Sequence, residues 1–534
     1  MSITSLSFLL FIAITFVLYY LLPKRFQWCI LLTASIFFYL YAGFKSSIYI
    51  FITATTIYFA TLALQKLSNI RKRYLKENKE TLTKEEKAAY KAHVQKKRRW
   101  VMVCVLLLNI GFLSVFKYFH FALEQLNRII SVFGGNRIED SFQLIVPLGI
   151  SFYTFQAVGY LLDVYWENVV PERNYLKVLL YVSFFPQITQ GPISDFETFS
   201  GELFSEHTFS YKNYSWGFQR MVWGFFKKML VANVLSPYVN DVFANYPAYS
   251  GISTLIGAFM YSVQIYADFS GYMDIMCGFC EMLGIRLTEN FDRPYFAKSI
   301  AEYWRRWHMS LGAWYKKYIY FPIGMSSWSR KFAKVNKERF GKHFSDSFPA
   351  TIALLVVWTC TGAWHGASWA YITWGLLNGM FIILSLWLEP LYASIRMRLH
   401  LRENGHLWNA FRLIRTFVLV TFIKVLPEVG TLSDGLGLWW NIFTNWSVPR
   451  TIGELLPYVD LSRTIFAINF LICIAGTFLM FAVDCIQYKK PVRTYFNMLP
   501  PLVRQIILAG VIILIASFGV QASWGIGGFL YANF

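Results

Sequence analysis

Charged residues are scarce in this chain. Only 15% of its 534 residues are charged, whereas 56% are hydrophobic, and soluble domains usually carry about 25% charged residues. This composition excludes an ordinary water-soluble fold. Several uncharged stretches reach the roughly 18 to 25 residues that a helix needs to cross a bilayer. We therefore expect an all-α polytopic membrane protein with roughly a dozen transmembrane or re-entrant helices, forming a single membrane domain over residues 1–534.

Cysteine and nucleotide-binding motifs are equally scarce. The seven cysteines lie mostly inside apolar runs, and only Cys277 and Cys280 are close together, with no histidine spacing nearby that fits a zinc site. The sequence contains no Walker loop, and no glycine-rich fingerprint lies between a predicted strand and helix. We therefore expect no metal and no bound cofactor, and ATP-driven transport is disfavoured.

The apolar runs predict where the spans lie. The first run has no basic residues before it, and Lys24 and Arg25 follow it, so we expect a retained span rather than a cleaved signal peptide. The predicted spans lie near residues 6–22, 26–43, 47–66, 100–118, 144–165, 175–190, 215–234, 252–284, 408–426, 464–485 and 503–520, with a hairpin over residues 349–388.

The hairpin prediction rests on forty consecutive positions, residues 349–388, that contain no charged side chain. The segments before and after it are basic, so both of its ends are expected on the cytoplasmic side. The chain would then cross the membrane and return, with a break near Gly362, Gly366 and Ser368. His365 would lie at the tip of this hairpin, deep in the membrane and nearer the outer face.

The net charge is +20, but the basic residues cluster between apolar runs, which is typical of cytoplasmic loops rather than of nucleic-acid binding. Residues 68–99 contain twelve Lys or Arg and four Glu. We expect this loop to be cytoplasmic, as a charged helix or helical hairpin attracted to anionic lipid headgroups. Three spans precede it, which places the N-terminus outside, and residues 428–460 are predicted to be extracellular. The topology between residues 190 and 345 stays open.

Polar groups at membrane depth are costly and therefore mark either function or internal hydrogen bonding. Gln156, Tyr160, Asp163 and Glu167 follow a helical spacing, and interhelical hydrogen bonding is the favoured interpretation of this stripe. A second group lies in the run QIYADFSGYMD, where Gly271 permits close helix approach; this group could also be scaffold. The candidate substrate-binding or tunnel residues are Gln156, Asp163, Gln264, Asp268, Ser270, Tyr272, Trp304, Arg305, Trp307, Trp364 and Asn378.

The third group joins residues 302–324 with residues 362–369 and contains two histidines. Within it, Glu302 is predicted to pair with Arg306, one helical turn later. His308 and His365 each follow a tryptophan within segments that are poor in other titratable bases. A lone histidine in an apolar setting is more often a packing residue, but the presence of two weakens that interpretation. A neutral, buried imidazole is a suitable general base, because burial keeps its lone pair available. His365 and His308 are therefore the candidate catalytic residues.

The order of the motifs DFSGYMD, ENFDRPY, EYWRRWHMSL, YIYFPIG and GAWHGASW resembles the membrane-bound O-acyltransferase family, and its alginate O-acetyltransferase branch in particular. PLGISFYTFQAVGYLLDVY and FFPQITQGPI, between Pro147 and Ile193, also resemble that branch and its relative in teichoic acid D-alanylation. The likeness covers roughly residues 1–390, and the length beyond the WHG motif favours the alginate-type branch.

This resemblance implies a ring of tilted helices around a narrow central tunnel in a bacterial plasma membrane. An acyl thioester, acetyl-CoA or another, would enter from the cytoplasm, and the acceptor, an extracytoplasmic polysaccharide or partner acetyltransferase, from outside. The family's invariant histidine maps onto His365 and its second active-site position onto His308. His365 would deprotonate the accepting hydroxyl, and His308 would orient the donor or stabilise the oxyanion.

Three alternatives remain open from the residues. The first is a proton-coupled transporter in which His308, His365 and Asp268 relay protons without covalent chemistry. The second is a non-catalytic scaffold of a polysaccharide export complex. Within the family, D-alanyl transfer to teichoic acid is the third.

Overall fold

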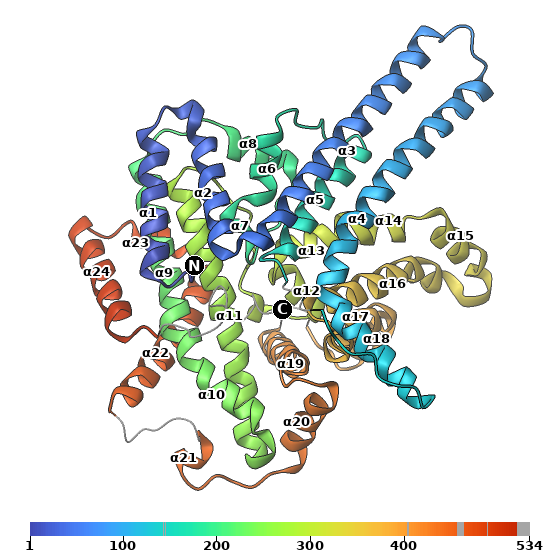
Figure 1. Ribbon diagram of the computed structural model, residues 1–534. Helices are drawn as coiled ribbons and strands as arrows, with labels where there is room; N and C mark the ends of the chain where they lie inside the picture. Colours follow the sequence, from blue (N-terminus) through green and yellow to red (C-terminus); the bar gives the residue numbers. More distant parts are fainter. Residues whose placement is uncertain (143, 145, 403–404, 457–463, 489, 521–534) are drawn as a thin grey trace. The chain divides into compact units, whose positions relative to one another are not determined.

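The computed structural model describes residues 1–142, 144, 146–402, 405–456, 464–488 and 490–520 (Figure 1). Its regular structure is helical, and among these residues the only pairing of β type is an isolated bridge between Phe291 and Trp307. The all-α class predicted from the sequence is therefore confirmed. The described chain divides into two compact units, each described by itself below: unit 1 is Met1–Tyr214 with Cys280–Thr288, and unit 2 is Ser215–Phe279 with Glu289–Phe534.

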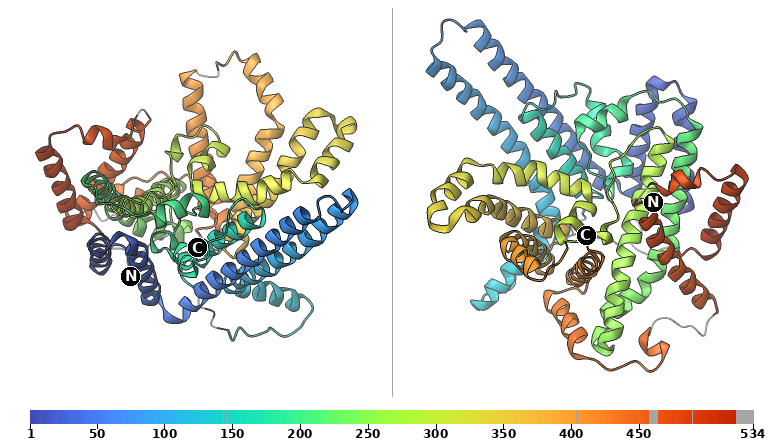
Figure 2. Two further views of the ribbon diagram at one scale, coloured as in Figure 1. Left: turned by 90° about the horizontal axis from the view of Figure 1, so that it is seen from above. Right: turned by 180° about the vertical axis from the view of Figure 1, so that it is seen from behind.

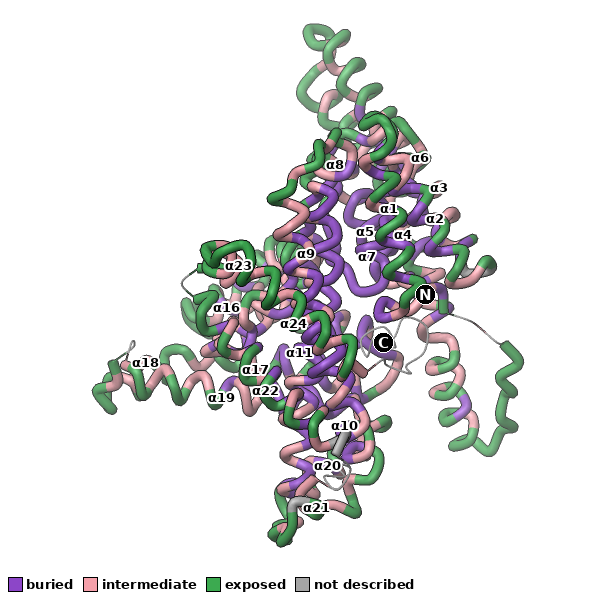
Figure 3. Tube along the Cα trace, turned by 90° about the vertical axis from the view of Figure 1, so that its left-hand side faces the viewer, coloured by how far each residue is buried: buried purple, intermediate pink, exposed green. Residues whose placement is uncertain are grey.

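Unit 1 is built from apolar helices joined by short connections. Its helices are α1 (Leu6–Leu21), η1 (Lys24–Phe26), α2 (Gln27–Ala42), α3 (Phe44–Glu77), α4 (Lys84–Val132), α5 (Ile150–Tyr165), α6 (Tyr175–Ser183), α7 (Phe185–Ile188) and α8 (Phe196–Phe204). Burial differs strongly between these helices. Most residues of α5 and all residues of α7 are buried, as the colours of Figure 3 show, whereas α1 exposes many of its leucines.

The basic loop at residues 68–99 was predicted to be a charged helix or a helical hairpin, and it is a helical hairpin. It consists of the ends of α3 and α4, which pack against each other as antiparallel helices in all three views (Figures 1 and 2). The turn between them ends at Thr83, whose hydroxyl accepts a hydrogen bond from the backbone N–H of Glu86 while the Glu86 carboxylate accepts one from the Thr83 N–H. This capping box starts α4. The charged loop is thus a continuation of two spans rather than a separate element.

Unit 2 contains the two candidate catalytic histidines. It begins within α9 (Tyr211–Phe226). Its further helices are η2 (Lys227–Ala232), α10 (Asn233–Ala244), η3 (Tyr246–Ala248), α11 (Gly251–Met282), η4 (Pro294–Phe296), α12 (Ile300–Arg306), α13 (Met309–Tyr315), η5 (Lys316–Tyr320), α14 (Phe321–Gly324), α15 (Ser327–Val335), α16 (Lys337–His365), α17 (Trp369–Trp387), α18 (Glu389–Arg398), α19 (His406–Val425), α20 (Leu432–Thr444), α21 (Ile452–Leu455), α22 (Thr464–Ile486), α23 (Val492–Phe496) and α24 (Pro501–Phe518). The predicted extracellular segment 428–460 contains α20 and α21, and its residues 457–460 lie outside the described part.

The hairpin predicted over residues 349–388 is confirmed. Helices α16 and α17 pack along each other, and the break between them spans Gly366 to Ser368. Ser368 starts α17, since its hydroxyl accepts a hydrogen bond from the Tyr371 backbone N–H at 3.3 Å. His365 is the last residue of α16 and therefore lies at the tip, as predicted.

Seven helices of the described chain are long and apolar enough to cross a membrane: α2, α3, α4, α16, α17, α22 and α24. Helix α1 is apolar but has only 16 residues. Other predicted spans fall on helices that are shorter or more polar, such as α5 and α19. A multi-pass membrane protein is therefore established, whereas the count of roughly a dozen spans stays a prediction.

Candidate active site

His365 is buried at the end of α16 and surrounded by aromatic rings. The rings of Trp364 and Trp374 each meet it edge-on, with centroids 4.8 Å away, and the Tyr371 ring lies nearly parallel to it at 6.5 Å. Gly366 makes this arrangement possible, because a Cβ at this position would lie 2.0 Å from the Tyr371 ring. The turn after His365 thus brings two helices close together around one imidazole.

Two further predicted site residues, Trp304 and Asn378, support this aromatic cage. The Trp304 indole N–H donates a hydrogen bond to Asn378 Oδ1 at 3.0 Å, and Asn378 Nδ2 donates to the Trp374 carbonyl at 2.8 Å. The Trp304 ring also meets the Trp374 ring edge-on, with centroids 5.5 Å apart. Asn378 therefore fixes the Trp304 indole against α17, next to Trp374.

His308 is also buried, in the connection between α12 and α13. Its backbone has a left-handed conformation, with φ of 49°, which is uncommon for a residue with a side chain. Asn290 stabilises this turn, because it accepts hydrogen bonds from the backbone N–H groups of Met309 and Ser310, at 3.0 Å each. The His308 ring meets the Phe269 ring edge-on, with centroids 4.9 Å apart.

Trp364 relates the two histidines in space. Its ring centroid lies 4.8 Å from that of His365 and 6.1 Å from that of His308. The structure therefore places both candidate catalytic residues next to one indole, although they come from separate motifs. The predicted ion pair between Arg306 and Glu302, in the helix before His308, is confirmed at 2.7 Å.

A narrow cavity of about 30 Å³ borders His365. His308 does not line it. Its wall combines aromatic rings with two charged side chains, Lys424 and Glu428, that the sequence pattern did not indicate. The other lining residues are Tyr261, Ile265, Trp304, Trp307, Tyr371, Trp374 and Pro427. The His365 imidazole thus shares its cavity with one cation and one carboxyl group.

Lys424 lies over the face of Trp307, with its ammonium nitrogen 3.6 Å from the ring centroid. A cation at this distance is attracted by the negative face of the indole. The Lys424 ammonium also donates a hydrogen bond to the Tyr295 hydroxyl at 3.2 Å. Trp307, a predicted site residue, is therefore the ring closest to the Lys424 nitrogen, which also lies over the Tyr295 and Tyr303 rings at 5.2 Å each.

Glu428 lies one turn beyond Lys424, just after α19 ends at Val425. The Tyr371 hydroxyl donates a hydrogen bond to Glu428 Oε1 at 3.4 Å. Burial raises the pKa of the Glu428 carboxyl to about 7, although hydrogen bonds from Tyr261 and Tyr371 and the charge of Lys424 act in the opposite direction. This carboxyl group can therefore change its protonation state near neutral pH.

The predicted residues of the DFSGYMD run form a separate, charged cluster. Lys228 pairs with Asp268, while the Lys227 ammonium donates to Ser270 Oγ at 2.8 Å and pairs with Asp274 at 2.6 Å. Arg220 binds Asp274 at 2.8 Å and Glu289 at 2.6 Å. These ion pairs explain why an apolar run contains three basic residues. Tyr272 is fully buried on the same helix, α11.

The close helix approach expected at Gly271 is confirmed. A Cβ on Gly271 would lie 2.9 Å from the carbonyl oxygen of Gly224, and one on Gly224 would lie 2.6 Å from that of Gly271. The two glycines therefore let α9 and α11 touch along their backbones. This contact brings Lys227 and Lys228 within reach of the acidic residues on α11.

The remaining predicted residues lie elsewhere. Gln156 is in unit 1, where its amide donates hydrogen bonds to the Tyr181 carbonyl at 3.0 Å and to Gln187 Oε1 at 3.2 Å. These bonds support the interpretation of this stripe as interhelical hydrogen bonding. Asp163 is buried on the same helix, α5, and Arg305 in unit 2 is exposed.

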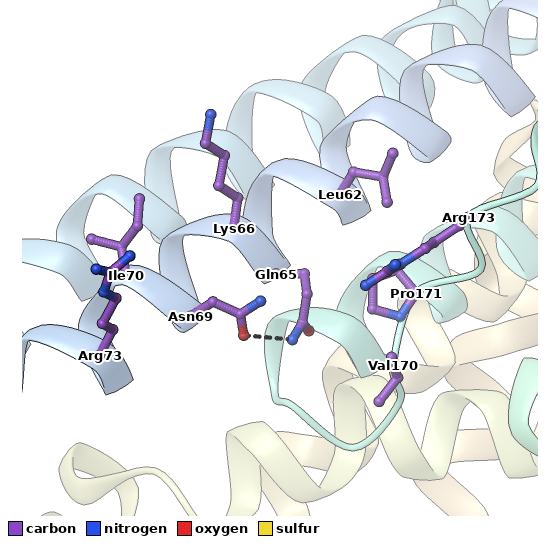
Figure 4. Close-up of a pocket in the computed structure, with 9 residues that line it drawn as sticks. All are labelled: Leu62, Gln65, Lys66, Asn69, Ile70, Arg73, Val170, Pro171 and Arg173. Atoms are coloured by element: carbon purple, nitrogen blue, oxygen red, sulfur yellow. Dashed lines mark hydrogen bonds between the residues drawn. The ribbon is translucent and has the colours of Figure 1, made fainter. Parts of the chain in front are cut away.

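Glu167 was expected on the α5 stripe, but it lies beyond the end of that helix, with φ of 64°. There it forms ion pairs with Arg71 at 2.5 Å, Lys72 at 3.1 Å and Arg98 at 2.9 Å. A groove of about 490 Å³ lies nearby in unit 1, and Figure 4 shows that α3 and the 170–173 segment line it. None of the predicted site residues lines this groove.

The residues that sequence reasoning missed left a detectable signal in one case. Lys424 is the single charged residue of the apolar run 416–427, and an ionisable residue in such a position marks function or pairing. Glu428 left none, because it lies in a turn after the predicted span, where an acidic residue is ordinary. Tyr261 is likewise one of many aromatic residues in apolar segments.

Comparison with known proteins relates the chain to one family. The sequence model of the MBOAT, or membrane-bound O-acyltransferase, family matches residues 172–336. That match contains His308 and ends before His365.

Several curated proteins are similar to the chain. The probable alginate O-acetylase AlgI of Azotobacter vinelandii is 31% identical over 375 residues, which is 70% of this chain and 66% of that protein. The peptidoglycan O-acetyltransferase of Helicobacter pylori is 30% identical, over 53% of this chain and 54% of that protein. The teichoic acid D-alanyltransferase of Streptococcus thermophilus is 26% identical, over 47% of this chain and 60% of that protein. The chain thus spans about two thirds or less of the length of these relatives.

Proposed function

Because this chain belongs to the membrane-bound O-acyltransferase family, we propose that it transfers an acyl group, most simply acetyl, from a thioester donor to hydroxyl groups of an extracytoplasmic acceptor. The observation that carries this proposal is the position of His365: a buried imidazole at a hairpin tip, enclosed by aromatic rings and bordering a cavity with a cation. Acyl transfer to a hydroxyl requires a general base in such a setting.

The proposed reaction uses His365 as that base. The imidazole takes the proton from the acceptor hydroxyl as its oxygen attacks the thioester carbonyl carbon. A C–O bond forms and the C–S bond breaks, and the proton passes to the departing thiolate, so that the products are an ester and a free thiol. General-base catalysis contributes typically 10²- to 10⁴-fold.

Two groups are suited to the negative charge that develops on the carbonyl oxygen. His308, near Trp364, would orient the donor or donate to the oxyanion. Lys424 would contribute a hydrogen-bond donor, because its contact with Trp307 and its bond to Tyr295 hold its terminal nitrogen at the cavity wall. Loss of one oxyanion donor typically costs about 10²- to 10³-fold in rate.

The finer architecture is part of the same proposal. A ring of tilted helices would surround a central tunnel that admits acetyl-CoA or another acyl thioester from the cytoplasm. Residues 68–99 would lie in the cytoplasm and the N-terminus outside, in the plasma membrane of a bacterium. A polysaccharide acceptor, or an extracytoplasmic acetyltransferase partner, would dock near residues 428–460.

The names of these three relatives differ in acyl group and in acceptor, so both are choices within the proposal. The relatives named O-acetylase and O-acetyltransferase are 30–31% identical to the chain, against 26% for the D-alanyltransferase. This difference supports acetyl transfer to a polysaccharide over D-alanyl transfer.

The test is radiolabel transfer. Cells that produce the wild type or a His365→Ala variant would be supplied with label in the acyl group of acetyl-CoA, and ester label in the surface polymer would be measured per amount of inserted protein. We expect label in the wild type only. Equal label in both would refute the proposed role of His365, and absence of label in the wild type would favour a transporter or scaffold.

A further inference from the structure

A second cavity adjoins the one that borders His365. It has a volume of about 360 Å³ and lies between α10, the middle of α11 and the turn after α19. Tyr261 and Glu428 line both cavities. The wide cavity and the narrow one therefore meet at these two side chains, and the candidate base, His365, lines the narrow one.

Gln264 supplies an independent sign that this wide cavity holds a ligand. Its side chain lines the cavity and is only 2% exposed. Among the described residues, none donates a hydrogen bond to its carbonyl oxygen, Oε1. Buried polar atoms are nearly always hydrogen-bonded, so a partner with a hydrogen-bond donor is expected at this position.

The rest of the wall defines the chemistry of that partner. Asn240 and Glu428 add polar groups, while Phe243 and Tyr261 add aromatic rings. A small number of polar groups on a largely apolar wall is typical of small-ligand sites, and about 300 Å³ is enough for one. Several hydroxyl donors on a ring with an apolar face would match this wall.

Other occupants match it less well. A lipid chain would leave the Gln264 carbonyl without a partner, which is costly for a buried polar group. A serine hydroxyl of a partner protein would bring one donor for several polar groups. A sugar brings several hydroxyls within the span of one ring.

We propose that the wide cavity binds one sugar residue of a polysaccharide acceptor, with Gln264 accepting a hydrogen bond from one hydroxyl and Glu428 holding the reacting hydroxyl towards His365. This assignment rests on the proposed acyltransferase function and names its acceptor site. Asn240 and Tyr261 complete the contacts. The narrow cavity then admits only the hydroxyl that reacts.

The test measures binding separately from chemistry. The melting temperature of the full-length protein in detergent would be measured with hexasaccharides of mannuronate, N-acetylglucosamine and glucose. We expect at least one of them to stabilise the wild type, and Gln264→Leu and Glu428→Gln to weaken its apparent affinity by at least tenfold. Gln219→Leu is the matched control, because Gln219 is a mostly buried glutamine of α9 that bonds Ser215 and Asn497 instead.

A parallel assay follows thiol release from acetyl-CoA by the wild type and by His365→Ala, and this assay tests the proposed function. If wild type releases thiol and His365→Ala does not, the function stands whatever the sugars do. If no hexasaccharide stabilises the wild type, or if Gln264→Leu and Glu428→Gln bind it as the control does, the acceptor-site assignment is wrong.

Discussion

Two buried polar regions of unit 2 differ in one respect that matters for function. In the charged cluster of α9, η2 and α11, the cations Arg220, Lys227 and Lys228 each have acidic partners. Around His365 the surroundings are aromatic, and the polar groups border a cavity. The cluster has the more ionisable groups, but the His365 region has the space for a reactant.

The comparison teaches that charge at membrane depth does not by itself locate chemistry. A paired charge has already satisfied its electrostatic demand within the protein and mainly fixes how helices pack. A reaction needs a group that can exchange a proton with a substrate, and hence a place for that substrate. We therefore propose that the cluster is scaffold and that the His365 region is the reaction site.

The largest effect is expected at His365. His365→Ala should abolish acyl transfer while the protein stays inserted, because the only other titratable side chains between residues 349 and 388 are those of Cys360 and Tyr371. Their unperturbed pKa values are about 8.5 and about 10, which makes both poor substitutes. Surface ester content would be measured together with the amount of detergent-stable protein. If the variant lost stability but kept wild-type transfer per folded molecule, His365 would be a packing residue.

A smaller loss is expected at His308. His308→Ala should reduce transfer by about 10²- to 10³-fold, equivalent to about 3 to 4 kcal/mol for one oxyanion donor, and leave measurable activity. Initial rates with saturating acyl thioester would show it as a fall in kcat. A change confined to KM would instead assign His308 to donor binding, and wild-type kinetics would remove it from the site.

Substitutions in the charged cluster should change stability rather than chemistry. Lys228→Met leaves Asp268 buried without its cation, which typically costs about 3 to 5 kcal/mol, whereas replacing both partners by apolar residues is often neutral. We therefore expect the double variant Lys228→Met/Asp268→Leu to recover most of the stability that the single variant loses. Thermal unfolding in detergent tests this expectation, and a double variant no more stable than the single one would contradict it.

The smallest effect is a pH dependence. Burial raises the pKa of Glu428 to about 7, so this group ionises as the pH rises from about 6 to 8, and the carboxylate is the better hydrogen-bond acceptor for a sugar hydroxyl. The apparent KM for acceptor should therefore fall over this range. His365, Tyr261, Tyr371 and Lys424 face the same cavity.

Their contributions are removed by comparison with Glu428→Gln, which cannot ionise at this position. That variant should lose the fall in KM between about pH 6 and 8 while the other groups titrate as before. An identical KM profile in both proteins would show that Glu428 does not contact the acceptor.

Much of the fold could be predicted from the sequence, where one local pattern decides the structure. The forty uncharged positions broken by glycines predicted the α16–α17 hairpin, and the spacing of Glu302 and Arg306 predicted their ion pair. Gly271 predicted a close helix contact, because a residue without a side chain lets a neighbouring backbone approach. The histidines were selected for the same reason, as rare titratable groups in apolar segments.

Partners from distant segments could not be predicted in this way. Nothing in the spacing indicates that Lys424 stacks on Trp307, or that Glu428 meets Tyr371, because these contacts depend on how α17 and α19 pack. The same holds for Lys227 and Lys228. Their charges made the predicted span near residues 215–234 uncertain, and their acidic partners, Asp274 and Asp268, come from a distant helix. Glu167 was misplaced on α5 because helical spacing does not show where a helix ends.

The central claim is that chemistry occurs in the aromatic region around His365 and not in the charged cluster. Its most direct test is to measure acyl transfer per folded molecule, side by side, in His365→Ala and in Lys228→Met/Asp268→Leu. We predict no detectable transfer in the first and transfer within a few-fold of wild type in the second. Transfer retained by His365→Ala and lost in the folded double variant would contradict the account.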